Sequence, residues 1–157
     1  MSLKSSSSPD EREIVVTRLI DAPRALVFEA FKDPEHITQW WGPNGFTTTT
    51  HKMDFRPGGL WLSTMHGPDG TDYPNRTRYT EIREPELIAY DHDGGESGDP
   101  GFAFKQSITF EAEGRKTRVT FRLVMATPEQ RAVLAKFGAV EGGNQTLSRL
   151  ASYLAQA

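Results

Sequence analysis

The chain of 157 residues carries a net charge of −3 and no cysteine, which excludes disulfides, thiolate catalysis and cysteine metal sites. No run of Lys or Arg forms the basic stripe that nucleic acid requires, and no apolar stretch approaches the roughly 20 residues that span a bilayer. Length and composition therefore predict one cytoplasmic domain with a sizeable core, without nucleic acid as a partner and without membrane insertion.

The start of the chain is polar and rich in serine, so residues 1–12 are predicted to be a disordered lead to a single domain at residues 13–157. The β-branched run from Ile14 to Ile20 predicts the first strand. Asp21 is expected to cap the helix that follows, with Pro23 in its first turn, where a missing N–H costs nothing.

A second short helix is predicted directly afterwards. Asp33-Pro34 repeats the cap-and-proline signal, and Gly42-Pro43 ends the helix after the paired residues Trp40 and Trp41. Two short helices between the first strand and the rest of the sheet are the first indication of topology.

From Phe46 onward the apolar period changes from helical to alternating and predicts six strands separated by glycine or proline turns. We place them at residues 47–55, 60–66, 76–82, 87–92, 102–110 and 119–123. The acidic, glycine-rich segment at residues 93–101 is predicted to be a flexible loop at the rim of the sheet.

Thr127-Pro128 predicts the start of a helix that Gly138 interrupts, and an apolar stripe ending in Leu147, Leu150 and Leu154 predicts a last helix. Gly142 and Gly143 allow two interpretations. Either the last helix begins after them, which we favour because adjacent glycines weaken a helix, or they leave room beside the sheet.

These elements together predict an α+β fold. Short sequential strands favour an antiparallel sheet of about seven strands, and the last helix must cover its apolar face. A curved sheet wrapped around one long helix leaves a gap between the two layers, and this gap is the candidate binding site.

Several motifs carry a resemblance to a known family. They are Asp21-Ala22-Pro23, Asp33-Pro34 before Trp40-Trp41-Gly42-Pro43, Arg56-Pro57-Gly58-Gly59-Leu60-Trp61, Gly67-Pro68-Asp69-Gly70 and Pro85-Glu86. With them, the sequence resembles the START-like, helix-grip superfamily, and more narrowly the bacterial single-domain proteins named after the activator of heat-shock protein 90 ATPase. The resemblance runs from Ile14 to Leu154.

That resemblance implies the helix-grip fold and a hydrophobic cavity, but it implies no single reaction, so no catalytic residue is transferred. It also implies a chaperone ATPase as an alternative partner. The position of Ser63 often holds a larger apolar residue in such sequences, so the cavity is expected to be roomier or more polar there.

The candidate ligand site combines aromatic walls with a few polar groups, as small-molecule pockets do. Its predicted residues alternate along the strands so that they point inward: Trp61, Met65, Tyr79, Tyr90, His92, Phe104 and Gln106. Gln106 is polar on an otherwise apolar face, so it should have a partner, for which Tyr79, His92, water and a ligand are the candidates. We predict a small hydrophobic or aromatic ligand and no cofactor.

The sequence gives less support to metal binding and to catalysis. The four histidines form no metal-binding motif, so no metal is predicted. An enzyme in which His92 or Tyr90 gives acid–base help to a bound ligand remains an alternative. A homodimer is predicted if the first strand or the Trp40-Trp41 region is exposed.

Overall fold

The computed structural model describes residues 9–93, 103–136 and 138–156. Five helices and seven strands follow one another in these ranges. Their order is α1 (Pro9–Arg12), β1 (Glu13–Ile20), α2 (Arg24–Lys32), α3 (Pro34–Trp40), β2 (Thr47–Met53), β3 (Leu60–His66), β4 (Asp72–Arg83), β5 (Leu87–Asp93), β6 (Ala103–Glu113), β7 (Lys116–Val124), α4 (Pro128–Lys136) and α5 (Ala139–Gln156). The predicted α+β fold is confirmed.

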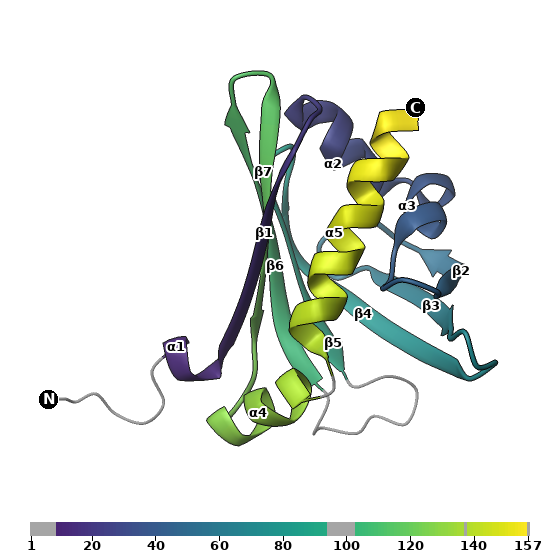
Figure 1. Cartoon of the computed structure of the whole chain (residues 1–157), viewed down its shortest axis with the longest axis vertical. Coiled ribbons are helices and arrows are strands. Elements are labelled where there is room, and N and C mark those ends of the chain that lie inside the picture. The colour runs from purple at the N-terminus through teal and green to yellow at the C-terminus, as the bar shows by residue number, and fades with distance from the viewer. Residues whose placement is uncertain (1–8, 94–102, 137, 157) are drawn as a thin grey trace, which may run out of the picture.

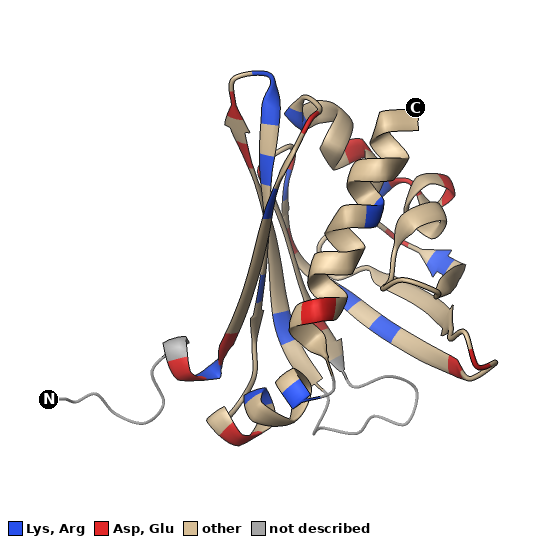
Figure 2. Cartoon of the chain, viewed as in Figure 1, with Lys and Arg blue, Asp and Glu red and all other residues tan. Residues whose placement is uncertain are grey.

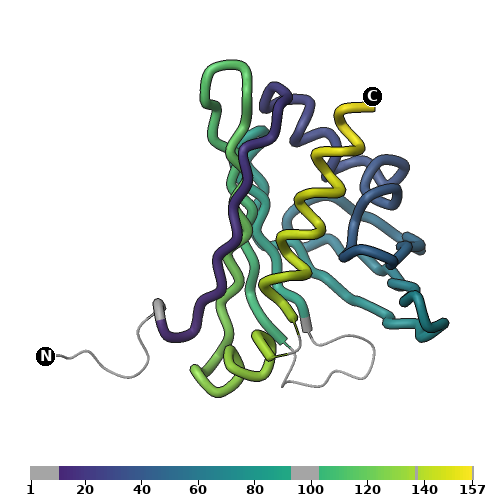
Figure 3. The backbone as a smooth tube through the Cα atoms, viewed as in Figure 1, coloured from purple at the N-terminus to yellow at the C-terminus, as the bar shows by residue number. Residues whose placement is uncertain are grey.

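All seven strands form one antiparallel sheet in the order β1-β7-β6-β5-β4-β3-β2. Consecutive strands are neighbours except β1, which pairs with β7, so β1 and β2 are the two edges. The long helix α5 runs diagonally across one face of the sheet, with α2 and α3 beside it (Figure 1). The backbone trace shows the strands bending around this helix (Figure 3).

The main core lies between these helices and the face of the sheet that they cover, here called the inner face. It combines fully buried residues of α2, α3 and α5, such as Phe28, Trp40 and Leu150, with Ile108 and Val119 of the sheet. Phe31 lies at its centre, with ring centroids 4.8 Å from Trp40 and 5.1 Å from Phe110. A smaller cluster of Ile14, Met125 and Leu134 holds α4 against the end of the sheet.

Several predicted boundaries are wrong near the beginning of the chain. Pro9–Arg12 form one helical turn within the segment predicted to be disordered. Asp21 does not cap α2, because the N-cap residue is Pro23, which has no side-chain acceptor. Asp33 does cap α3, since its Oδ1 accepts from the backbone N–H of Glu35 at 2.9 Å.

The predicted start of β4 is also corrected. β4 begins at Asp72 rather than Arg76, because the Gly67-Gly70 turn is tight and the polar residues after it pair with β3. The segment at residues 93–101 lies outside the described residues, except that Asp93 ends β5.

The last helix does not begin after its paired glycines. α5 starts at Ala139 and includes both of them. A methyl group on Gly143 would lie 2.8 Å from Cγ2 of Val16, so this glycine lets α5 approach β1 closely instead of leaving room for a ligand.

Candidate functional site

Six of the seven predicted site residues form two adjacent rows across the inner face. Trp61, Thr77, His92 and Phe104 pair in succession across β3, β4, β5 and β6, and we call them the first row. Tyr79, Tyr90 and Gln106 pair in the same way across β4, β5 and β6 and form the second row. Thr77 was not among the predicted residues, although its strand parity with Tyr79 places it on the same face.

Met65, the seventh predicted residue, lies apart from these rows. It pairs with Tyr73 near the end of β3 and is only half-buried. Its Cε lies 3.2 Å from the position that a methyl group on Gly42 would occupy, so Met65 packs against the loop after α3. Strand parity predicted the face of Met65 correctly but not the loop that covers it.

The aromatic part of the site is closely packed. The space enclosed by these rings is about 10 Å³, enough for about one water molecule. Its walls are Phe31, Ile37, Trp41, Phe55, Trp61, Tyr79, Ile88, Tyr90 and Ile108. The predicted hollow is therefore nearly filled at Trp61, Tyr79 and Tyr90.

The two tyrosines of the second row are buried among other rings. Their ring centroids lie 6.2 Å apart in an edge-to-face arrangement. Burial raises the pKa of Tyr79 above the ordinary value for a phenol, and burial together with the nearby Tyr79 raises the pKa of Tyr90 further. Both phenols are therefore protonated at neutral pH and are poor bases.

Polar side chains interrupt this apolar wall at three positions. Gln106 is 6 % exposed, and Thr77 and Ser63 are each 4 % exposed. None of the three forms a side-chain hydrogen bond with another residue in the part of the chain that the structure describes. In that same part, no completely buried side-chain nitrogen or oxygen lacks a partner. The polar atoms of these three residues must therefore remain within reach of solvent, although the residues themselves are buried.

Two of the four predicted partners of the Gln106 amide are therefore excluded. Neither Tyr79 nor His92 bonds the amide, although both are close in the sheet. His92 instead stacks on Phe104 with ring centroids 4.8 Å apart and has a further interaction partner. Water or a ligand remains as the hydrogen-bond partner of the Gln106 amide.

Arg149 ties α5 to the loop that follows α3. Its Nη1 donates to the carbonyl oxygens of Gly42 and Pro43 at 2.9 and 3.0 Å, and it lies 3.5 Å from that of Trp41. Burial lowers the pKa of Arg149, but a guanidinium stays charged in proteins. This cation therefore holds the helix beside the sheet.

Comparison with known proteins identifies the family. Residues 21–155 match the family described as activator of Hsp90 ATPase homolog 1-like protein. The chain belongs to this family. No protein with a curated description matches the sequence.

Solved bacterial structures share the fold of this family member. A protein from Arthrobacter aurescens is 24 % identical with a TM-score of 0.87, over 96 % of this chain and 90 % of that one. A protein from Nitrosomonas europaea is 24 % identical with a TM-score of 0.84, over 93 % of this chain and 96 % of that one. At this identity the similarity shows the fold alone.

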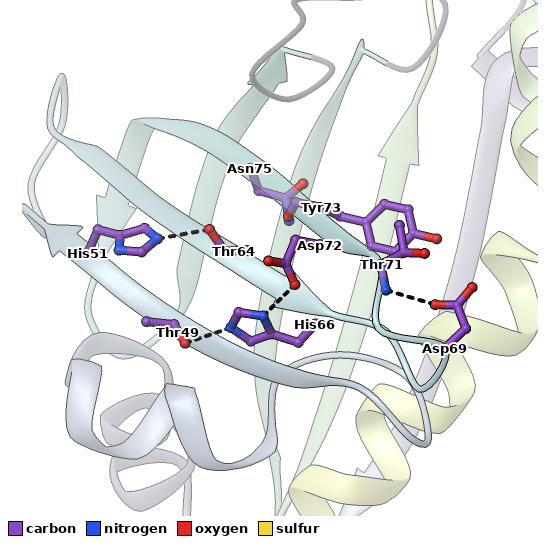
Figure 4. Close-up of polar contacts among 9 residues, drawn as sticks. All are labelled: Thr49, His51, Thr64, His66, Asp69, Thr71, Asp72, Tyr73 and Asn75. Atoms are coloured by element: carbon purple, nitrogen blue, oxygen red, sulfur yellow. Dashed lines mark hydrogen bonds and ion pairs between the residues drawn. The ribbon is translucent and has the colours of Figure 1, made fainter.

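The outer face of the sheet carries a histidine network that the sequence did not predict. His66 lies between Asp72 and Thr49, with Nδ1 2.7 Å from the carboxylate and Nε2 2.8 Å from the hydroxyl (Figure 4). His51 pairs with the hydroxyl of Thr64 at 2.8 Å, beside an open depression of about 300 Å³. Pairing of the predicted strands β2, β3 and β4 is the feature of the sequence that could have revealed these histidine contacts.

The hydroxyl, imidazole and carboxylate of this network stand in the order that activates a nucleophile. Thr49 and Asp72 are nevertheless exposed, so water rather than fixed donors would solvate any charge formed there. We therefore assign no reaction to the network.

One group of possible metal ligands occurs among the described residues. Donor atoms of Glu29, Asp33 and His36 lie within 4.8 Å of one another. Each already has another contact: Lys32 lies 3.7 Å from Glu29, Asp33 caps α3, and Nδ1 of His36 lies 2.6 Å from the hydroxyl of Tyr153. These contacts account for the cluster without an ion.

A second open depression, of about 340 Å³, touches His92 and Phe104 at the ends of β5 and β6. Its walls also include Asp91 and Lys105, which alternate with the buried residues and so belong to the outer face. The depression therefore lies at the end of the sheet, and none of the described residues that line it belongs to α5.

In the described residues, no helix is both long enough and apolar enough to cross a bilayer. Charges of both signs are spread over the strands, whereas α5 carries only Glu141 and Arg149 (Figure 2).

Proposed function

We propose that this protein binds a small hydrophobic or aromatic molecule between the inner face of the sheet and α5. The aromatic rings of the two rows supply the apolar contact, and Gln106, Thr77 and Ser63 orient the ligand. The family and its fold support a binding module of this kind.

One observation carries this proposal: polar side chains without protein hydrogen-bond partners, in residues that are largely buried, lie among aromatic rings. The amide of Gln106 keeps contact with solvent in the free protein, and covering it without replacing its hydrogen bonds would cost about 1–3 kcal/mol. Simple core packing would favour an apolar residue at Gln106, as at its strand neighbour Ile108. A ligand that presents a polar group to the amide accounts for both its identity and its position.

The closely packed interior sets a condition on binding. Pockets for small molecules usually measure about 300–1,000 Å³, far more than the space between the rings. The ligand must therefore displace side chains or shift α5 when it enters. We expect the backbone around Gly42 and Arg149, which holds α5 in place, to respond to binding.

Amide NMR spectra of the purified protein, titrated with aromatic and lipid probes, test the proposal. We expect a binder to shift the side-chain amide of Gln106 and the backbone signals of Thr77 and Tyr90. The signal of Thr64, on the neighbouring outer face, is the internal control and should move little. If every binder shifts only outer-face signals, or if no probe binds, the proposal is wrong.

A chaperone-binding module is the second candidate, suggested by the family description. Val15 and Leu19 are 45 % and 37 % exposed on one face of the edge strand β1, which suits a protein partner. A pull-down with the bacterial chaperone, followed by its ATPase assay, tests this function. Stimulation that disappears in Leu19→Lys and persists in Gln39→Lys, which alters an exposed residue of α3 outside this face, would support it, and an unchanged ATPase rate would contradict it.

A further inference from the structure

Among the residues that the structure describes, the inner-face strand positions of the proposed ligand site carry no formal charge. These positions hold aromatic and aliphatic side chains, and their polar members carry hydroxyl, amide or imidazole groups: Ser63, Thr77, Tyr79, Tyr90, His92 and Gln106. From the opposite side, α5 contributes Arg149, whose guanidinium is already bonded to backbone carbonyls.

The polar groups of the site can both donate and accept hydrogen bonds. An amide offers an N–H donor and a carbonyl acceptor, and a hydroxyl offers one of each. Gln106 and Thr77 lie on neighbouring rows of the sheet, on either side of the β5 residues Tyr90 and His92. The pair therefore suits a neutral group with both capacities, such as a phenol, an alcohol or an amide.

A charged ligand would fit this wall poorly. Burying a carboxylate or an ammonium without an ionic partner costs far more than burying a neutral polar group. Ionised Tyr79 or Tyr90 would not compensate an ammonium, because both phenols stay protonated when buried. A ligand without any polar group would in turn leave the amide of Gln106 unbonded.

We infer that the site selects an uncharged aromatic ligand that carries one hydrogen-bonding group, read mainly by Gln106. This inference rests on the proposed function and adds the chemical class of the ligand to it. Discrimination of this kind is strong in proteins, because a buried polar group that loses its partner is costly.

Three probes of the same ring size separate the possibilities: naphthol, naphthalene and naphthoate. Affinities are measured by fluorescence titration and by NMR with the wild-type protein. We expect naphthol to bind about tenfold more tightly than naphthalene, the factor that corresponds to one net hydrogen bond. Naphthoate should bind more weakly than naphthol.

The substitution Gln106→Leu tests the residue that is proposed to form a hydrogen bond with the polar group of the ligand. It should abolish the preference for naphthol over naphthalene while leaving naphthalene bound at least as tightly. Gln39→Leu is the matched control, because Gln39 is an exposed glutamine on α3, and its preference should equal that of the wild type. A Gln106→Leu protein that still binds naphthalene is folded, so this comparison does not depend on a separate folding assay.

The outcomes distinguish this inference from the proposed function. Equal binding of naphthol and naphthalene by wild type, at a site mapped to Tyr90 and Thr77, would overturn the ligand class and leave small-molecule binding intact. Tighter binding of naphthoate than of naphthol would overturn the requirement for a neutral ligand. Failure of all three probes to bind at the inner face would count against the proposed function and, with it, this inference.

Discussion

The side chain of Gln106 has no protein hydrogen-bond partner although the residue is only 6 % exposed, and this has a consequence for stability. Replacing it with leucine removes a polar group from an apolar wall and keeps a similar volume. We expect Gln106→Leu to raise the free energy of unfolding by about 1 kcal/mol, measured by urea denaturation. Gln39→Leu should leave stability nearly unchanged, since Gln39 is exposed. A clear loss of stability in Gln106→Leu would mean that the amide is part of a satisfied network.

Individual residues also show what the sequence could and could not predict. Alternation along a strand assigns a face to each side chain, so the inward orientation of Trp61, Tyr90 and Gln106 followed from the sequence alone. Alternation says nothing about which helix or loop covers a given row. Met65 was therefore placed in the site although it packs beside Gly42, and Thr77 was missed because a small polar residue gives no apolar signal.

At the scale of one element, α5 contains two adjacent glycines with different surroundings. A methyl group on Gly142 would lie 3.9 Å from Cβ of Pro43, an ordinary contact, whereas one on Gly143 would lie 2.8 Å from Val16. Val16 is β-branched and has little freedom to turn away. Substitution of Gly142 therefore changes mainly helix propensity, whereas substitution of Gly143 also changes the packing of α5 against β1.

We expect Gly142→Ala to raise the free energy of unfolding by up to about 1 kcal/mol, because alanine favours a helix over glycine. Gly143→Ala should lower it by about 1–3 kcal/mol, since the methyl group pushes α5 away from β1. Chemical denaturation of both variants measures these changes. Equal stabilisation by the two substitutions would show that α5 and β1 are not in close contact at Gly143.

The elements as a group were predicted with uneven success for one physical reason. Caps and turns are local, so the start of α3 at Asp33 and the start of α4 at Thr127 could be predicted from a few residues. Gly143 violates local helix propensity for the sake of a contact with β1, more than a hundred residues earlier in the sequence. Only the tertiary structure reveals that contact, so the predicted start of α5 was wrong.

The whole molecule combines a complete antiparallel sheet with an interior that is filled by rings. The order of strands and helices followed from alternation, turns and the family resemblance, whereas the volume left between sheet and helix did not. That volume depends on how each ring is oriented against its neighbours. Phe31, for example, contacts Trp40, Trp41, Phe110 and Phe121 in edge-to-face arrangements.

Because the aromatic interior is continuous, its tyrosines link ionisation to unfolding of the whole protein. The pKa values of Tyr79 and Tyr90 are raised by burial above the usual value of 10.0. In the unfolded chain both phenols ionise near pH 10, while in the folded chain they keep their protons. Their contribution to stability is therefore fully present below about pH 10 and is lost as the pH rises further.

We expect unfolding in alkaline solution, in which phenolate absorbance from these two tyrosines appears together with the loss of circular dichroism. Well above pH 10, each should lower stability by about 1.4 kcal/mol per pH unit. Tyr90→Phe should move the transition to higher pH, because one ionising group is removed from the unfolded state. Tyr73→Phe, in which the altered ring is 45 % exposed, should move it much less. Phenolate signals from Tyr90 in a protein that keeps its native circular dichroism would show that the interior admits water freely.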